Sequence, residues 1–443
     1  MTRKHVIVIG AGFSGVAAAA ALARRKKAPH VTLIERARFG PGLAYGTRDK
    51  AHLLNVRAVN MSAYSDRPDD FANWLKKKTG AAPTAFAARR EYGAYLAEVL
   101  RRTERRALFG GGLKRMRGEA IACRAGSGWW QVALDSGKSI EANAVVLALG
   151  NQAVAAPPPV FANSGVPVID PWDARALQRI GRGDVLLLGA GLTMIDVALS
   201  LAARSRTQTI YALSRRGAMP RAHLDPPQSV LAAAPQMPTS LSSALHEFRR
   251  EVAVMAERGE PWQLAVDRLR AATPELWRSL PVDAQRRFLR HLRVWWDVHR
   301  HRAAPEVAAR AQALMESGKL RVLAGEVVSA GKAKGRYELY HRQRGSFVRH
   351  RLEVAAVVNC TGANLDLTRS DNPLIQQMLS EGLARAHPNG LGLDLDNEGR
   401  VLDGRGHVQG SLFAVGPLTA GAFWESTAVP EIRARAAAIA ALF

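Results

Sequence analysis

Residues 6–15 read V-I-V-I-G-A-G-F-S-G, which places a G-x-G-x-x-G motif directly after a short apolar run. The apolar run predicts a buried parallel strand, and the alanine-rich stretch at 16–24 predicts the helix that follows it. In such a unit Gly10 permits the tight turn, Gly12 lets a pyrophosphate approach the backbone, and Gly15 lets the helix pack closely on the strand. The N-terminus of the helix then points unpaired N–H groups at the phosphates. This stretch therefore predicts a dinucleotide-binding βαβ unit.

The second strand of this unit is predicted at residues 31–34, and Glu35 stands at its carboxyl end. A carboxylate in that position can hydrogen-bond both hydroxyls of an adenosine ribose. Glu35 and the adjacent Arg36 are therefore candidate cofactor-binding residues, together with Gly150 at the end of a later apolar strand, 144–150.

The first residues also allow another interpretation, because basic residues near Met1 precede an apolar run that ends near Ala23, as in a secretory signal. The glycine spacing, the basic cluster at 24–27 and the lack of a small-residue cleavage site argue against a signal peptide. We therefore expect a cytoplasmic protein.

The composition is that of an ordinary globular protein of 443 residues, except for a net charge of +24. The basic residues are spread along the chain, which favours solvated surfaces over a specific nucleic-acid site. No apolar run reaches membrane-span length, so we expect no membrane span. The two cysteines, Cys123 and Cys360, lie far apart, which predicts neither a metal site nor a dithiol redox pair.

The opening motif repeats at residues 184–194, D-V-L-L-L-G-A-G-L-T-M, where Gly189 and Gly191 occupy the first two glycine positions. Glu35 lies 25 positions after Gly10, and Ser214 lies 25 positions after Gly189. The acid is thus replaced by Ser214, which Arg215 and Arg216 follow, and guanidinium groups can pair with the 2′-phosphate of NADPH. Met194 replaces the third glycine, so a degenerate repeat that binds no nucleotide is the alternative.

The segment from about 223 to 317 has helical patterns rich in Arg, Leu, Ala and Trp. Such an insertion either caps a substrate cleft or forms a solvated bundle. Its stretch W-W-D-V-H-R-H-R at 295–302 would place Trp295, His299 and Arg302 near one helix face. That face could bind an anionic or planar group, or the tryptophans could simply pack in a core.

These patterns predict an α/β fold with two Rossmann-like dinucleotide-binding domains, the domain of the second motif being inserted in that of the first. We assign residues 1–155 and 330–443 to the first domain. Residues 156–329 form the second, with a helical insertion at about 225–317. Apolar strands at 352–362 and 411–417 each end near a glycine, and the last precedes a helix at 429–442.

Several blocks, in their order along the chain, resemble the two-dinucleotide-binding-domain flavoproteins. More closely they are similar to a bacterial family called "FAD/NAD(P)-binding protein", whose wider group includes ornithine and lysine N-hydroxylases and other class B flavin monooxygenases. The blocks are G-P-G-L-A-Y-G (40–46), H-L-L-N-V (52–56), F-A-A-R-R-E-Y-G-A-Y-L (86–96), G-A-G-L-T-M-I-D (189–196), W-D-V-H-R-H-R (296–302), N-C-T-G (359–362) and W-E-S-T-A-V-P-E-I-R (424–433).

The resemblance implies FAD in the first domain and NADPH in the second. It also implies that Asn55, Met61 and Arg89 border the flavin, and that Gly416 and Trp424 approach the flavin ring from the C-terminal side. The chain departs from relatives that end the last strand in Gly-Asp, because Pro417 follows Gly416 here. The F-x-G-x-x-x-H motif of flavin-containing and Baeyer–Villiger monooxygenases is also missing.

The resulting first hypothesis is a monooxygenase in which NADPH reduces FAD, O2 forms a flavin C4a-hydroperoxide, and a small amine or other nucleophile is oxygenated. Trp424, Asn55 and His299 are the candidates for the catalytic pocket. One alternative is an NADPH-dependent flavin reductase or dehydrogenase with a separate electron acceptor. A non-enzymatic alternative is a flavin-bearing redox sensor that binds an acidic partner through its basic surface.

Overall fold

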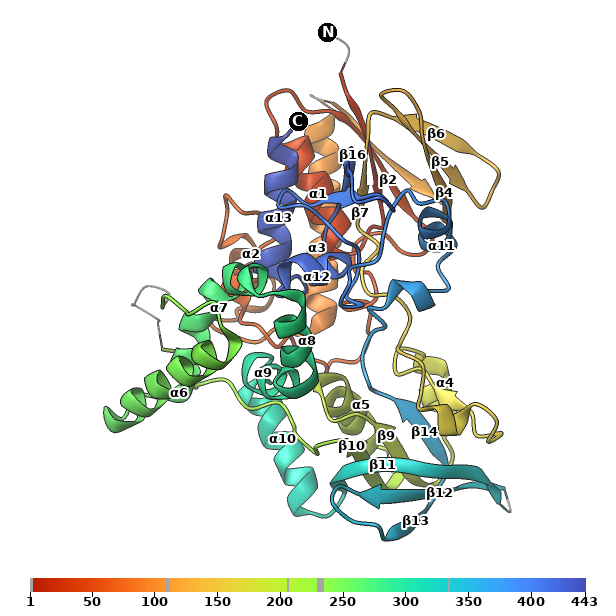
Figure 1. The fold of residues 1–443 in the computed structure, drawn as a ribbon, viewed down its shortest axis with the longest axis vertical. Helices are drawn as coiled ribbons and strands as arrows, with labels where there is room; N and C mark the ends of the chain where they lie inside the picture. Colours follow the sequence, from red (N-terminus) through yellow and green to blue (C-terminus); the bar gives the residue numbers. More distant parts are fainter. Residues whose placement is uncertain (1–2, 109–110, 205–206, 229–234, 334) are drawn as a thin grey trace.

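The computed structural model describes residues 3–108, 111–204, 207–228, 235–333 and 335–443. Two units, each built on its own sheet, follow one another along the long axis of the molecule, and both termini lie at the end formed by the first unit (Figure 1). The helical insertion lies beside the junction between them.

The first sheet has the order β15-β16-β7-β1-β2-β3, and all neighbours are parallel except β15 and β16. Val8 in the middle of the sheet pairs with Leu33 on one side and Val146 on the other. The strands in spatial order are β15 (Arg400–Leu402), β16 (Val408–Ala414), β7 (Ala144–Leu147), β1 (His5–Ile9), β2 (His30–Glu35) and β3 (Leu113–Arg117). The predicted strands at 6–9, 31–34, 144–150 and 411–417 thus form one sheet, which confirms the α/β class.

Alternation along β1 explains how the two faces of this sheet are covered. Val6 and Val8 point to a layer of helices, while Ile7 and Ile9 point to a small antiparallel sheet and its helix. The helical layer consists of α1 (Phe13–Ala23), α3 (Arg89–Ala107) and α13 (Val429–Ala441), extended by η1 (Ala58–Asn60) and α2 (Asp70–Thr79) (Figure 1). The opposite layer consists of β4 (Ala120–Ala125), β5 (Trp130–Leu134), β6 (Ser139–Ala142), η3 (Leu367–Arg369) and α11 (Pro373–Ser380).

The second sheet has the order β13-β12-β11-β10-β9-β14-β8, in which β11 through β8 are parallel and β12 and β13 extend the edge as an antiparallel pair. Its strands are β8 (Val168–Ile169), β9 (Gly183–Leu188), β10 (Thr207–Ser214), β11 (Leu320–Ala333), β12 (Arg336–Gln343), β13 (Arg349–Val354) and β14 (Ala356–Asn359). Helices α5 (Leu192–Ala202) and α10 (Pro305–Glu316) cover one face, while η2 (Pro159–Phe161) packs on the other and α4 (Ala174–Arg179) precedes β9.

The strand pairing differs from the predicted division at residue 330. Strands β11 to β14 lie in the second sheet, and β14 pairs with β9 as β7 pairs with β1. The apolar run ending at Asn359 is therefore the second unit's own closing strand and does not return to the first sheet. We propose about residue 360 as the second boundary.

The insertion consists of α6 (Leu241–Glu257), α7 (Trp262–Ser279), α8 (Val282–His291) and α9 (Arg293–Arg300). Helix α10, which the prediction included, packs on α5 and is the crossover between the parallel strands β10 and β11. The insertion docks on the C-terminal segment, which contains η4 (Pro417–Thr419) and α12 (Ala420–Phe423). There the indole N–H of Trp277 donates to the carbonyl of Gly421 over 2.7 Å, and Arg270 pairs with Glu431.

Candidate functional site

The first glycine turn is closed by direct backbone contact. Gly10 has a φ of 97°, and a Cβ there would lie 2.3 Å from the carbonyl oxygen of Ala148. A Cβ on Gly15 would lie 1.8 Å from the carbonyl oxygen of Gly10, so neither position accepts a side chain in this geometry. The helix begins at Phe13 with Gly12 as its N-cap, which leaves the N–H groups of the first turn free for an anion.

Glu35 stands beside this turn, at the end of β2. Its carboxylate accepts hydrogen bonds from the backbone N–H of Ala11 over 2.8 Å and of Ala37 over 2.9 Å. These bonds fix the acid at the place where the ribose of a dinucleotide would bind. Arg36 points elsewhere, because its exposed guanidinium pairs with Glu119 over 2.8 Å.

Two loops approach the same turn. The glycine-rich loop after β2 reaches it at Gly42, whose Cα would lie 3.5 Å from a Cβ on Gly12, and Gly40 donates to the carbonyl of Ala11. From the C-terminal side, a Cβ on Gly416 would lie 2.3 Å from Oγ of Ser14 in α1. Gly416 therefore lies against the start of the first helix, and its contact with a flavin stays a prediction, whereas the contacts of Gly42 and Ser14 were not foreseen.

Gly150 follows β7 and is partly exposed with open space beside it. It thus lies past the carboxyl end of a strand adjacent to β1. The carboxyl ends of adjacent parallel strands are where ligands bind in open α/β sheets.

The second turn repeats the first one closely. Gly189 has a φ of 109°, and a Cβ there would lie 2.5 Å from the carbonyl oxygen of Cys360. Gly191 is the N-cap of α5, and nothing lies within 4 Å of the position of its missing Cβ. Met194, in place of the third glycine, is fully buried in the core of the second unit, so its side chain is accommodated under the helix.

Ser214, Arg215 and Arg216, which were predicted to contact the 2′-phosphate of NADPH, stand at the end of β10. The hydroxyl of Ser214 accepts a hydrogen bond from the N–H of Gly217 over 3.0 Å, which shapes the turn. Arg215 is exposed, and the guanidinium of Arg216 lies 5.6 Å from the ring centroid of Trp295 in the insertion. The two arginines are thus available at the end of the strand, and Arg216 also links this edge to α9.

The predicted flavin-side residues of the first unit have protein partners. Arg89 forms a buried ion pair with Asp196 of α5 over 2.9 Å and donates to the carbonyl of Leu53. Met61 is buried in the core of the first unit. The carbonyl of Asn55 accepts a hydrogen bond of 2.9 Å from Nε2 of His223, and burial lowers the pKa of this histidine to about 4. Their contact with a flavin stays a prediction.

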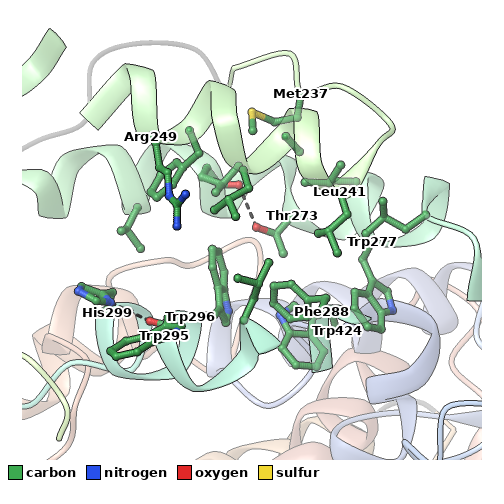
Figure 2. A pocket seen from close by; sticks show the side chains of 18 of the residues that line it. Met237, Leu241, Arg249, Thr273, Trp277, Phe288, Trp295, Trp296, His299 and Trp424 are labelled. Carbon is green, nitrogen blue, oxygen red and sulfur yellow. Dashed lines mark hydrogen bonds between the residues drawn. The ribbon is translucent and has the colours of Figure 1, made fainter. Parts of the chain in front are cut away.

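Trp424 and His299, the other catalytic candidates, line one cavity of about 480 Å³ in the insertion (Figure 2). Helices α6 and α7 form one wall, and α8, α9 and Trp424 form the other. Trp424 stacks on Trp277 with ring centroids 4.8 Å apart, and His299 packs edge-on against Trp262. Asn55 does not line this cavity, so the structure brings together two of the three candidates.

Glu425, next to Trp424, anchors the insertion. Its buried carboxylate accepts hydrogen bonds from Nε1 of Trp296 over 3.0 Å and from the guanidinium of Arg300 over 2.8 Å. Glu425 also lines a second cavity of about 340 Å³, with Gly416 and Ser426. The segment 416–426 therefore lines both cavities, the first at Trp424 and the second at Gly416, Glu425 and Ser426.

The part of the chain that the structure describes contains neither a thiol pair nor a candidate metal site. Cys123 and Cys360 are both buried and unpaired, and burial raises the pKa of the Cys123 thiol to about 12. No group of three or more His, Cys, Asp or Glu side chains among the described residues could hold a metal ion. None of the described helices is long and apolar enough to cross a membrane.

Comparison with known proteins supports the arrangement of two nucleotide-binding units. Residues 7–152 match the model of the FAD-NAD(P)-binding family, and no curated protein has a significantly similar sequence. The ornithine hydroxylase from Pseudomonas aeruginosa is structurally similar with a TM-score of 0.66 at 16% identity, over 100% of this chain and 98% of that one. L-lysine 6-monooxygenase from Pseudomonas syringae has a TM-score of 0.66 at 18% identity, over 99% of both chains. An ornithine N-hydroxylase from Kutzneria sp. 744 has a TM-score of 0.63 at 17% identity, over 100% of this chain and 99% of that one.

At these identities the similarity establishes the fold. The chain has the fold of the two-dinucleotide-binding-domain flavoproteins, and its residues 7–152 match the FAD-NAD(P)-binding family.

Proposed function

We propose that the protein is an NADPH-dependent FAD monooxygenase that oxygenates a small amine or other nucleophilic molecule. The observation that carries the proposal is the position of segment 416–426, which touches the first glycine turn at Gly416 and forms a wall of the insertion cavity at Trp424. A flavin held at the first turn would thus be connected to this cavity through a single segment of the chain.

The residues present fit both nucleotides. FAD would be held by Gly10, Gly12 and the N-terminus of α1 at its pyrophosphate, and by Glu35 at its ribose. NADPH would be held at Gly189 and Gly191, with its 2′-phosphate at Ser214, Arg215 and Arg216. When bound, these groups would supply the redox chemistry, and the protein would supply their orientation.

The neighbouring structures are consistent with this reaction class. Their names describe hydroxylases and a monooxygenase of ornithine and lysine, and one of them contains reduced FAD, NADP⁺ and L-ornithine. In the proposed reaction the substrate, O2, NADPH and one proton give the oxygenated product, NADP⁺ and water. One oxygen atom enters the substrate, and the two electrons from NADPH reduce the other to water.

The absence of a dithiol among the described residues favours oxygen over a disulfide as the electron acceptor. Cys123 lies in the core below the first sheet and Cys360 lies in the core of the second unit, so the two thiols cannot pair with one another. A buried thiol with a raised pKa is also a poor nucleophile.

The experiment that tests the proposal follows NADPH consumption, hydrogen peroxide and oxygenated product together. FAD-loaded protein is incubated with NADPH in air, with and without a panel of amines, thioethers and amino acids. The expected result is one substrate for which product formed equals NADPH consumed. Rapid flavin reduction with peroxide as the sole product for every candidate would instead establish a reductase or oxidase, and no flavin reduction would refute the second nucleotide site.

A further inference from the structure

The insertion cavity is lined almost entirely by apolar surface. Helix α6 contributes side chains at positions 241, 244, 245, 248 and 252, a spacing that places them on one helical face. At about 480 Å³ the cavity has the size of a small-molecule site. Its floor carries the indoles of Trp295, Trp296 and Trp424, as the close view shows (Figure 2).

Several polar groups of the lining are hydrogen-bonded within the protein. The hydroxyl of Thr273 donates to the carbonyl of Leu269 over 2.9 Å, inside its own helix. The indole N–H groups of Trp277 and Trp296 donate to Gly421 and Glu425. These side chains therefore turn their apolar surfaces to the cavity and leave few hydrogen bonds for a ligand.

The charges around the cavity are positive. Among the described residues that line it, Arg249 is the only one with a permanent charge, and none is acidic. The carboxylate of Glu425, which follows the lining residue Trp424, is 2% exposed and pairs with Arg300. Trp295 already carries the guanidinium of Arg216 on its ring. An ammonium group entering the cavity would find no carboxylate partner among the described lining residues and would meet the guanidinium of Arg249.

The backbone of Trp424, in the inner wall of the cavity, also has an unusual conformation. Trp424 is the only described non-glycine residue with a positive φ, 49°, a backbone conformation that costs free energy for a large side chain. The surrounding contacts maintain it, with Trp277 stacked on the indole and Phe288 edge-on at 5.2 Å. Such strain is typical of a position where a side chain must be presented to a ligand.

From these observations we propose that the insertion cavity is the substrate site and that it binds an apolar, planar molecule that is uncharged or carries a single negative charge. The anionic group would lie at Arg249, beside His299, and the rings would lie on the tryptophan floor. The same site excludes protonated amines, including zwitterionic diamino acids.

This inference rests on the proposed function, because it names the substrate class of the same reaction. It restricts the nucleophile to one that is uncharged at neutral pH, such as a thioether or an aromatic amine. Ligand binding to the oxidised protein without NADPH is independent of turnover, so the two proposals can fail separately.

The first test compares three ligands that share one ring system and differ in charge. 2-Naphthol, 2-naphthoate and 2-naphthylmethylamine are each titrated into the FAD-loaded, oxidised protein by calorimetry, without NADPH, at pH 7.5. We expect the neutral and anionic ligands to bind and the ammonium ligand to bind at least about tenfold more weakly. Equal binding of the amine would overturn the proposal. Binding by none of the three ligands would also overturn it.

The second test locates the binding in the cavity. Arg249→Gln should weaken the binding of 2-naphthoate by roughly tenfold and leave the binding of 2-naphthol unchanged, since only the anion contacts the guanidinium. Arg250→Gln is the matched control, because the adjacent Arg250 is exposed and pairs with Glu247 on the outer face of α6. If both variants weaken the anion equally, general surface charge explains the binding and the assignment to the cavity is wrong.

A third test fills the cavity. Val266→Trp should abolish binding of both ligands, because Val266 is buried and lines the cavity. Leu245→Trp, at a partly exposed lining position, fills the same space with less disturbance if the first variant does not fold. His246→Trp on the exposed side of α6 is the control and should bind like the wild type. Unchanged binding in a folded Leu245→Trp variant would contradict the proposal.

Discussion

The guanidinium of Arg89, at the start of α3, lies 2.9 Å from the carboxylate of Asp196 on α5, and both side chains are largely buried. This ion pair joins the two nucleotide-binding units, since α3 packs on the first sheet and α5 on the second. Nearby, His52 of the first unit contacts the hydroxyl of Ser200 on α5 over 2.9 Å, and Ser200 donates to Asp49 over 2.6 Å. The relative position of the two units is therefore fixed by buried polar contacts.

We expect Arg89→Gln to destabilise the protein by on the order of 3 kcal/mol, because it leaves the carboxylate of Asp196 buried without its partner. The loss should depend on pH. Burial raises the pKa of Asp196 and Arg89 opposes that rise, so the pKa should rise further in the variant. A carboxyl whose folded pKa exceeds its unfolded value is destabilising once ionised, so the deficit should be smaller at pH 5 than at pH 8.

Urea unfolding at both pH values measures this difference. The exposed Arg351, which pairs with Glu338 across a strand pair, provides the control, since Arg351→Gln should change stability little at either pH. A deficit for Arg89→Gln that grows toward pH 5 would contradict the account of the buried pair.

The docking of the insertion gives a second prediction. Glu425→Gln keeps an acceptor for Trp296 but leaves the buried Arg300 without a counter-charge. We expect faster hydrogen exchange in α9 and α7, measured by mass spectrometry, with the strands of both sheets unaffected. Glu398→Gln is the control, since Glu398 is half exposed and pairs only with Arg400. Unchanged exchange in α9 would show that the other docking contacts, such as the hydrogen bond from Trp277 to Gly421, hold the insertion without this ion pair.

The glycine turns, the parallel strands and the repeat could be predicted from the sequence because their causes are local. A turn at φ near 100° admits little but glycine, and the spacing from Gly10 to Glu35 reappears between Gly189 and Ser214. The fold follows from such units, because each must bury the apolar faces of its strand and helix.

Side-chain partners across the chain could not be predicted in this way. Arg89 matched a block expected beside the flavin, but Asp196, which neutralises it, lies 107 positions further on a different unit. The strand ending at Asn359 resembles the one ending at Gly150, and only the pairing with β9 shows to which sheet it belongs. Helical patterns in the insertion could be predicted, but the cavity depends on α8, α9 and Trp424 lying opposite α6 and α7.

Replacing the first glycine of either motif by alanine should impair one nucleotide site and leave the other intact. Gly10→Ala places a methyl group against Ala148, and Gly189→Ala places one against Cys360, with strain of about 1–3 kcal/mol at these φ values. We expect Gly10→Ala to weaken FAD binding by roughly ten- to hundredfold. Gly189→Ala should weaken NADPH binding by a similar factor, while the FAD content stays normal. Flavin absorbance of the purified protein and NADPH titration measure these effects. Gly181→Ala, where nothing lies within 4 Å, is the control.

Nucleotide preference gives a separate prediction for the edge after β10. Replacing Arg215 and Arg216 by glutamine removes the proposed charge-assisted contacts to the 2′-phosphate, each worth about 1.5–3 kcal/mol. The KM for NADPH should rise roughly a hundredfold or more, and that for NADH should change little. Arg182→Gln, at an exposed position before β9, is the control. An equal rise for both nucleotides would mean that the arginines act through Trp295 and the insertion and do not contact the phosphate.

His223 should make the stability of the protein sensitive to acid. Its ring donates to the carbonyl of Asn55, and burial, helped by nearby arginines, lowers its pKa to about 4 from an unfolded value near 6.5. The unfolded chain therefore takes up a proton between pH 6.5 and 4 that the folded chain refuses. His223 thus contributes stability above pH 6.5 that is lost as the pH falls through this window.

Between pH 6 and 4.5, one such proton corresponds to about 1.4 kcal/mol of unfolding free energy per pH unit. We expect the wild type to lose stability more steeply than His223→Gln in this range, by up to that slope, in urea titrations at half-unit pH intervals. The exposed His407→Gln should retain the wild-type slope. Parallel curves for wild type and His223→Gln would mean that His223 is protonated in the folded protein, and its hydrogen bond to Asn55 would then survive acid.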